Sequence, residues 1–397
     1  MAASAIDASP PQAGARMSVS DIYANAHALR DYLREKSAEI DEARRLPPEV
    51  AARLRDAGMF RLAMPKSWGG PELSTFEQIE VIEEISRGNA AAGWCVMIGC
   101  DSGFFSAHLE DAVGRRLYPR LDMVTAGQAS VVGIAERVEG GYRASGNFAF
   151  ASGITHADVV IAGCIIQENG SSVSAGPSGR WLLIPASECE IQDTWHTTGL
   201  RGTGSNDFHL SNVFVPEERS FNFFEPARRA TALYRANNTF LPKFSGVPLG
   251  AARAMIDLVA ETMQTKVEFP TGRSYKSIPR VQSAIAEAEM ILGAARSYVF
   301  SATEREWKRL EKGEQLTERE RADVWLCRVH VAHAAREVIR MLYDAVGGSA
   351  IYSRKGPFDR ALRDAETWCQ HVVVQRRTLE HIGAMLLKSG GSPFPFL

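Results

Sequence analysis

The feature of this sequence that most constrains its fold is the order of three blocks with different periodicity. Residues 18–121 and 233–388 carry apolar side chains at helical spacing, and residues 122–232 consist of short runs rich in β-formers. Gly, Asn and Pro separate these runs. We therefore predict a mainly α protein with a central β-barrel: an N-terminal helical domain, a middle β-barrel domain and a C-terminal four-helix bundle.

Local signals support this division. Ser74 and Glu77 form an S-x-x-E capping box before an amphipathic stretch, and the apolar segment 90–100 predicts a buried helix. Gly140-Gly141 between two β-runs predicts a hairpin. Four long helical segments predict the bundle, at residues 247–266, 278–310, 317–346 and 358–387.

Composition excludes several classes of protein. The formal net charge of -2 gives no reason to expect nucleic acid or an anionic membrane as a partner. Neither a signal peptide nor a run of about 20 apolar residues is present, so we expect a cytoplasmic location. Residues 1–17 read as a disordered N-terminus and 389–397 as a loose tail. The six cysteines show no CxxC pair, which argues against a disulfide framework or a zinc site.

Nucleotide and metal signatures are also missing from the sequence. Neither GxGxxG nor GxxxxGK[ST] occurs, so an NAD(P)H-binding domain is not evident. His330 and His333 share one helix face, but no ExxH pair accompanies them, and we predict no metal site.

Five stretches, in chain order, resemble the acyl-CoA dehydrogenase superfamily. They are LPPEVAARLRDAGMFRLAMPKSWGG, YRASGNFAFASGITHAD, TTGLRGTGSNDFHLSNVFVPEE, GVPLGAARAMID and VGGSAIYSRKGPFDRALRDAETWCQH. Each is a weak motif alone, and the ordered set is specific. Within the superfamily the chain resembles the flavin-dependent monooxygenases. That resemblance implies reduced FMN or FAD as cofactor, O2 as co-substrate and a separate flavin reductase as partner.

The carboxylate base of a true acyl-CoA dehydrogenase is missing. Removal of an alpha proton needs a positioned base, which the family places in one of two segments. After Arg363-Asp364-Ala365 no E-G-T follows, and Glu366 comes too early. The other segment, 237–250, contains no carboxylate. Both observations argue against dehydrogenation.

Three residues are candidates for catalysis. In the monooxygenase branch the Gln370-His371 pair supplies a histidine near substrate and flavin; alternatively, it is a helix histidine that fills a polar gap. The resemblance places the Ser152 hydroxyl beside the flavin N5; alternatively, it satisfies its own turn. Asp101 stands where relatives often carry histidine, and it is either an acid/base group, a site for a cationic amine, or a solvated helix-end aspartate.

The resemblance also suggests residues for the flavin and the substrate. Arg273 corresponds to a position that meets the flavin phosphates across a subunit boundary, and the Gly347-Gly348 turn to one near the phosphate end, unless it simply caps a helix. The further candidates for the flavin are Gln128, Ala129, Ser130, Ser152, Gly153 and Gln370. The candidates for a substrate wall are Trp68 and Trp94, for which core packing is the alternative, and His156, which is otherwise an exposed turn residue.

The leading hypothesis is a monooxygenase that hydroxylates, or N- or S-oxidises, a small aromatic or cyclic substrate. One alternative is an FAD-containing acyl-CoA dehydrogenase or oxidase with a displaced base. Another is a non-catalytic assembly partner with a flavin-type fold. By resemblance we expect a homotetramer, arranged as a dimer of dimers.

Overall fold

The computed structural model describes residues 17–172, 179–236, 239–353 and 356–389. The N-terminal segment predicted to be disordered and the C-terminal tail therefore lie almost wholly outside the described residues.

In the described part of the chain, seven α-helices precede the sheet. The predicted capping box is present: the Ser74 hydroxyl accepts from the Glu77 N–H, and the Glu77 carboxylate accepts from the Ser74 N–H. The apolar segment forms the buried helix α5, as predicted. The helices are α1 (Val19–Glu35), α2 (Ser37–Ala43), α3 (Pro48–Asp56), α4 (Thr75–Gly88), α5 (Ala90–Gly99), α6 (Ser102–Ser106) and α7 (Asp111–Leu117).

The middle block forms one eight-stranded sheet that stays open, so the predicted barrel is wrong. Its strand order is β6-β7-β2-β1-β3-β5-β8, with β4 paired to β3. The strands are β1 (Thr125–Val138), β2 (Gly141–Phe148), β3 (Val159–Glu168), β4 (Ser171–Ser172), β5 (Arg180–Pro185), β6 (Glu190–Gln192), β7 (Asp207–Pro216) and β8 (Ser220–Phe221).

Strand lengths explain why the sheet does not close. The outer strands β6 and β8 have three and two residues, too few to form a continuous ladder with each other. The predicted hairpin at Gly140-Gly141 is confirmed by the antiparallel β1–β2 pairing, in which Val138 lies opposite Gly141. β1 and β3 pair in parallel, which alternating short β-runs did not predict.

The C-terminal helices differ from prediction in one place that matters for the site. Segment 358–387 was predicted as one helix, but the structure divides it into α12 and α13, with residues 369–377 in turns. The three consecutive valines 372–374 are poor helix formers, which favours the break. The helices are α8 (Ala232–Arg235), α9 (Gly246–Thr265), α10 (Pro279–Glu311), α11 (Glu318–Val346), α12 (Phe358–Trp368) and α13 (Thr378–Leu386).

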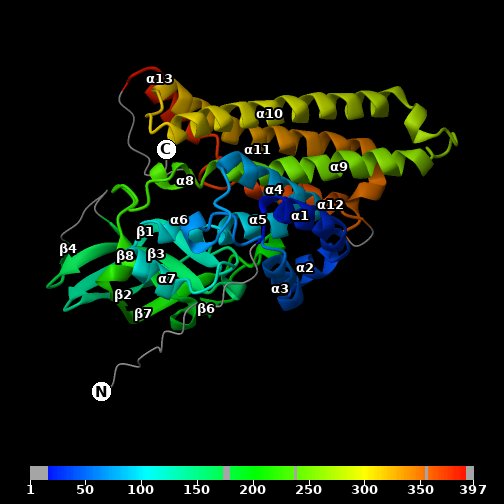
Figure 1. The fold of residues 1–397 in the computed structure, drawn as a ribbon. Helices are drawn as coiled ribbons and strands as arrows, with labels where there is room; N and C mark the ends of the chain where they lie inside the picture. The colour runs from blue at the N-terminus through cyan, green and yellow to red at the C-terminus, as the bar shows by residue number, and fades with distance from the viewer. Residues whose placement is uncertain (1–16, 173–178, 237–238, 354–355, 390–397) are drawn as a thin grey trace.

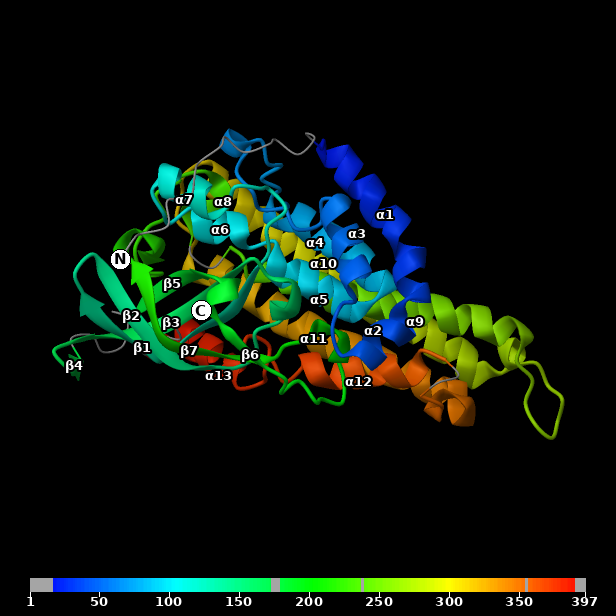
Figure 2. The ribbon, with the colours of Figure 1, turned by 90° about the horizontal axis from the view of Figure 1, so that it is seen from below.

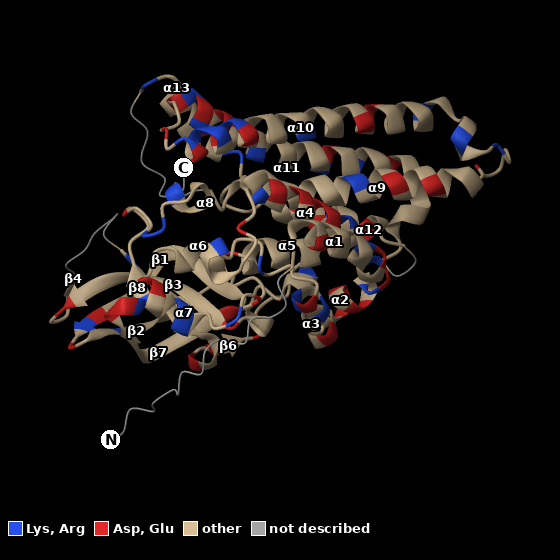
Figure 3. Ribbon diagram, in the orientation of Figure 1, with Lys and Arg blue, Asp and Glu red and all other residues tan. Residues whose placement is uncertain are grey.

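The sheet lies to one side of the molecule, and the long helices α9, α10 and α11 lie side by side on the other (Figure 1). α4 and α5 lie between these layers (Figure 1), and in the view from below they lie in the middle of the molecule (Figure 2). α5 contacts α9, β1 and the turn Arg201–Thr203. Acidic and basic residues are interspersed along the helices (Figure 3). None of the described helices combines the length and the apolar character required to cross a bilayer.

The sheet's own core predicts a stability contrast between two phenylalanines. Phe148 is fully buried and stacks on Phe208 at 4.7 Å, whereas Phe214 is 41% exposed on the neighbouring strand. We expect Phe148→Ala to lower the free energy of unfolding by about 3–5 kcal/mol. Phe214→Ala, the matched control, should change it by about 1 kcal/mol or less. Urea unfolding measures both, and equal losses would contradict this core.

Candidate active site

Trp94 of α5 stands where three parts of the chain meet. Its indole N–H donates to the Ser152 hydroxyl at 2.9 Å, in the segment that follows β2. Its ring packs edge-on against His371 and Phe244, with centroids 5.3 and 5.5 Å apart. Two predicted catalytic residues, Ser152 and His371, therefore lie on either side of a predicted substrate-wall residue.

His371 lies in the turn between α12 and α13, and α11 holds this turn in place. The Trp368 indole N–H donates to the Ala332 carbonyl at 3.1 Å, and the Arg328 Nε donates to the Val373 carbonyl at 3.2 Å. The His333 Nε2 lies 3.0 Å from the Val374 carbonyl oxygen. Because two of these bonds end on main-chain carbonyls of the turn, those of Val373 and Val374, they hold its backbone next to His371.

The surroundings of His371 define its protonation. The Val373 N–H lies 3.4 Å from Nδ1 and donates to it, so the proton of the neutral ring is on Nε2. Burial, and then the charge of Arg328, lower its pKa to about 4. His371 is therefore neutral at pH 7 and presents an N–H donor.

Ser152 is held in a tight turn that also exposes an aromatic ring. Phe150 has a φ of +62° and is 67% exposed, and Gly153 has a φ of +78°. The Gly153 N–H donates to the Thr203 carbonyl at 2.9 Å. The Ser152 hydroxyl lies 2.7 Å from the Ser205 hydroxyl. The left-handed turn thus presents Phe150 outward and holds Ser152 inward.

Gln128, Ala129 and Ser130 lie where β1 leaves the regular ladder. Pairing with β3 shifts register between Gln128 and Val131, so Ala129 and Ser130 have no partner residue there. β2 joins β1 only from Ile134 onward. The Gln128 Oε1 accepts from the Ala149 N–H at 2.9 Å, which ties this bulge to the Phe150 turn. The Ala129 carbonyl in this bulge accepts from the Trp181 indole N–H at 2.7 Å, so it is already paired although it lies outside the ladder.

Asp101 is not the solvated helix-end aspartate that was one alternative. It is 4% exposed and forms an ion pair with Lys243, which is 2% exposed. Burial raises the pKa of Asp101 to about 6, against the opposing effect of Lys243. Burial alone would lower the pKa of Lys243, but Asp101 reverses this and the pKa is raised. Both groups are charged at pH 7.

His156 lies beside the Ser152 turn, on its other side. Neither ring nitrogen has a hydrogen-bond partner among the described residues, and burial lowers the pKa of His156 to about 4. It borders a pocket of about 230 Å³ with Arg45, Arg55 and Thr155. The alternative of an exposed turn histidine is therefore wrong.

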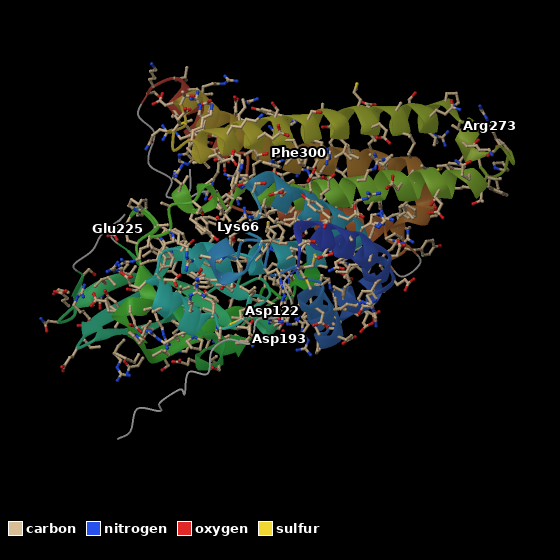
Figure 4. The ribbon with its side chains drawn as sticks, viewed as in Figure 1. Lys66, Asp122, Asp193, Glu225, Arg273 and Phe300 are labelled. Carbon is tan, nitrogen blue, oxygen red and sulfur yellow. The ribbon has the colours of Figure 1, made fainter. Side chains whose placement is uncertain are left out.

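The other predicted residues are not brought to this cluster. Trp68 donates to Asp111 at 2.7 Å and lies between Arg115 and Arg229. Arg273 lies at the far end of the bundle (Figure 4). Lys266 links the loop of Arg273 to the end of α11 beside Gly347 and Gly348, donating to Ser349 at 2.6 Å. Gln370 is exposed.

Four residues of the site were not singled out in the sequence. Lys243 and Phe244 lie in segment 237–250, which was considered only for a carboxylate base. A lysine within this largely apolar segment was the signal that could have indicated a buried charge. Thr203 and Ser205 fall in a stretch recognised only as a strand lead-in. Thr203 and Ser205 are 1% and 2% exposed.

No cluster of three or more histidine, cysteine or carboxylate side chains suited to a metal ion occurs in the described part of the chain. The carboxylate nearest to the family's base position, Glu366, is paired with Arg336 at 3.2 Å and with Arg340 at 3.6 Å. A second cavity, of about 270 Å³, is bordered by charged residues of α1, α4 and α9 and not by Trp94 or His371.

Comparison with known proteins decides the family. "Acyl-CoA dehydrogenase, N-terminal domain" matches residues 24–115, and "Acyl-CoA dehydrogenase, C-terminal domain" matches residues 243–376. The chain belongs to the acyl-CoA dehydrogenase family. Its relatives place it in the flavin-dependent monooxygenase branch.

Three of these relatives are informative. The indole-3-acetate monooxygenase of Pseudomonas putida is 30% identical, over 93% of this chain and 94% of that protein. The oxygenase component of the FADH2-dependent resorcinol hydroxylase of Rhizobium sp. is 29% identical, over 87% and 88%. The crystal structure of the HsaA monooxygenase from M. tuberculosis superposes with a TM-score of 0.87 at 24% identity, over 95% and 99%, which supports the fold.

The depressed pKa of His371 predicts a pH dependence of stability. The unfolded ring takes up a proton below about pH 6.5 and the folded ring only near pH 4, so stability is lost as pH falls between these values. In the wild-type protein the free energy of unfolding should decrease as the pH falls through this range. In His371→Gln this slope should be smaller, by up to about 1.4 kcal/mol per pH unit. Urea unfolding between pH 7.5 and 5 tests this, and an unchanged slope would contradict it.

The Asp101–Lys243 pair predicts strong non-additivity. Lys243→Met leaves a buried carboxylate without its partner and should cost about 3–5 kcal/mol. Adding Asp101→Asn should recover part of that loss, as measured by chemical unfolding. The surface pair Lys36–Glu39 is the control, and Lys36→Met should have a much smaller effect on the free energy of unfolding. Simple additivity of the two buried changes would contradict the pairing.

Proposed function

We propose that this protein is a monooxygenase that uses reduced FMN or FAD and O2 to oxygenate a small aromatic substrate. One observation carries the proposal: a neutral N–H donor, an indole and a serine hydroxyl meet at Trp94. This set suits recognition of an aromatic oxygen or nitrogen atom and does not suit removal of an alpha proton. The monooxygenases among its relatives support the same chemistry.

The residues around the Ser152 turn fit a flavin ring. The bulge at Ala129 and Ser130 would lie at its pyrimidine edge, Phe150 would offer an exposed aromatic face, and Ser152 would lie beside N5. Bound there, reduced flavin would supply the electrons that activate O2. Trp94 and Phe244 would exclude water and pack on the substrate ring. His371 would donate Nε2–H to the substrate.

The Arg273 loop and the Gly347-Gly348 turn lie together at the far end of the bundle, too remote for the Ser152 turn of their own subunit. We propose that they reach the flavin phosphates of a neighbouring copy in a homotetramer. Exposed apolar residues at this end support an interface: Val267 and Phe269 are 61% and 94% exposed, and Ile351 is 64% exposed. A separate reductase would supply the reduced flavin.

The alternatives make different predictions. A dehydrogenase with a displaced base would reduce a dye with an acyl-CoA, and a non-catalytic assembly partner would bind no flavin. Asp101 would not act as the displaced base, because Lys243 holds it as an ion pair.

A direct test supplies enzymatically reduced FMN or FAD and isotopically heavy O2, with indole-3-acetate, indole and resorcinol as probes. We expect one heavy oxygen atom in the product of at least one probe, detected by mass spectrometry. His371→Gln should lower coupled product formation by about 10- to 100-fold through loss of a donor in the reacting complex, while flavin oxidation continues to peroxide. Trp68→Phe, distant from the site, should retain activity. Acyl-CoA-dependent dye reduction without oxygen incorporation would reject the proposal.

A further inference from the structure

Three hydroxyl groups form a continuous hydrogen-bonded chain beneath the Ser152 turn. The Trp94 indole nitrogen lies 2.9 Å from the Ser152 oxygen, which lies 2.7 Å from that of Ser205. Ser205 lies 2.6 Å from the Thr203 hydroxyl, which lies 2.8 Å from the Leu200 carbonyl oxygen. We call this set the hydroxyl relay. Every member is at most 8% exposed, so water does not compete for these bonds.

The two ends of the relay fix its direction. An indole N–H only donates and a carbonyl oxygen only accepts, whereas each hydroxyl has one proton. If Thr203 donates to Leu200, then Ser205 must donate to Thr203, and Ser152 must donate to Ser205. This is the one assignment that satisfies all the contacts with the three available protons.

The assignment decides what Ser152 can offer a ligand. Its proton points to Ser205, and one of its lone pairs accepts from Trp94. One lone pair remains, so Ser152 meets any further group as an acceptor. Reversing the relay would free the Ser152 proton, but it would set the lone pairs of Thr203 and Leu200 against each other at 2.8 Å. A buried contact of that kind is unfavourable.

N5 of a flavin carries a hydrogen when the flavin is reduced and a bare lone pair when it is oxidised. We propose that the hydroxyl relay makes Ser152 a selector for the redox state of the flavin, accepting from N5–H of the reduced form and offering no donor to the oxidised form. The inference rests on the proposed function, which sets N5 beside Ser152. It assigns Thr203 and Ser205 as positioning residues.

Counting bonds gives the size of the effect. With reduced flavin the relay keeps its four internal bonds and gains a fifth from N5–H. With oxidised flavin the relay has four bonds in either direction. In the assigned direction none of them reaches N5, and in the reversed direction one does, but the lone pairs of Thr203 and Leu200 then oppose each other. One hydrogen bond corresponds to roughly a three- to tenfold difference in affinity.

The test compares dissociation constants of oxidised and photoreduced FMN and FAD, measured anaerobically by fluorescence or calorimetry. Ser205→Ala removes the acceptor of the Ser152 proton, which can then point to N5 of oxidised flavin. Thr203→Val lets Ser205 donate back to Ser152, with the same result. In both variants the preference for reduced flavin should fall by roughly three- to tenfold through tighter binding of the oxidised form. Ser152→Ala should weaken the reduced form alone.

Ser102→Ala is the matched control. Ser102 is a fully buried hydroxyl bonded to Thr125 at 2.8 Å in a separate network, and its loss should leave the ratio unchanged. Circular dichroism checks that each variant folds. An unchanged ratio in both Ser205→Ala and Thr203→Val would overturn the relay proposal while leaving the oxygenase proposal intact. If the wild-type protein binds neither redox form, the proposed function fails and this inference fails with it.

Discussion

The bond from the Trp94 indole to the Ser152 hydroxyl is the interaction on which the candidate site depends. It crosses from a helix of the N-terminal part to the turn after β2, and the same indole ring packs on His371 from the C-terminal part. Buried donors must find acceptors, so an indole at this place fixes both the turn and the helix relative to each other. The catalytic candidates are thereby held by packing between parts of the chain far apart in sequence.

Much of the architecture was predictable because it rests on periodicity. The capping box at Ser74, the buried helix around Trp94 and the hairpin at Gly140-Gly141 follow local rules that tertiary contacts did not override. That the sheet stays open was not predictable, since closure depends on the length of the outermost strands. The break after Trp368 was missed because the main-chain carbonyls of Val373 and Val374 bond to side chains of α11, which no local pattern reveals.

The site shows the same division. His371 and Ser152 were found by resemblance, and Trp94 was singled out as an aromatic ring that could wall a flat substrate; the structure brings the three together. The partner of Asp101 was not found, because Lys243 is 142 residues away and its burial is decided by packing. The relay through Thr203 and Ser205 was likewise invisible in sequence, where serine and threonine beside glycine read as ordinary turn residues.

The Asp101–Lys243 pair also restricts how a sequence of this kind can change. Two charges enclosed in apolar surroundings depend on each other, so a lineage that exchanges either one must pass through an intermediate with a single buried charge. That intermediate is destabilised unless the two codons change together or a neighbouring side chain first supplies a substitute charge. Homologues should therefore retain both residues or replace both. In a new relative, the residue aligned with position 243 should predict the residue aligned with position 101.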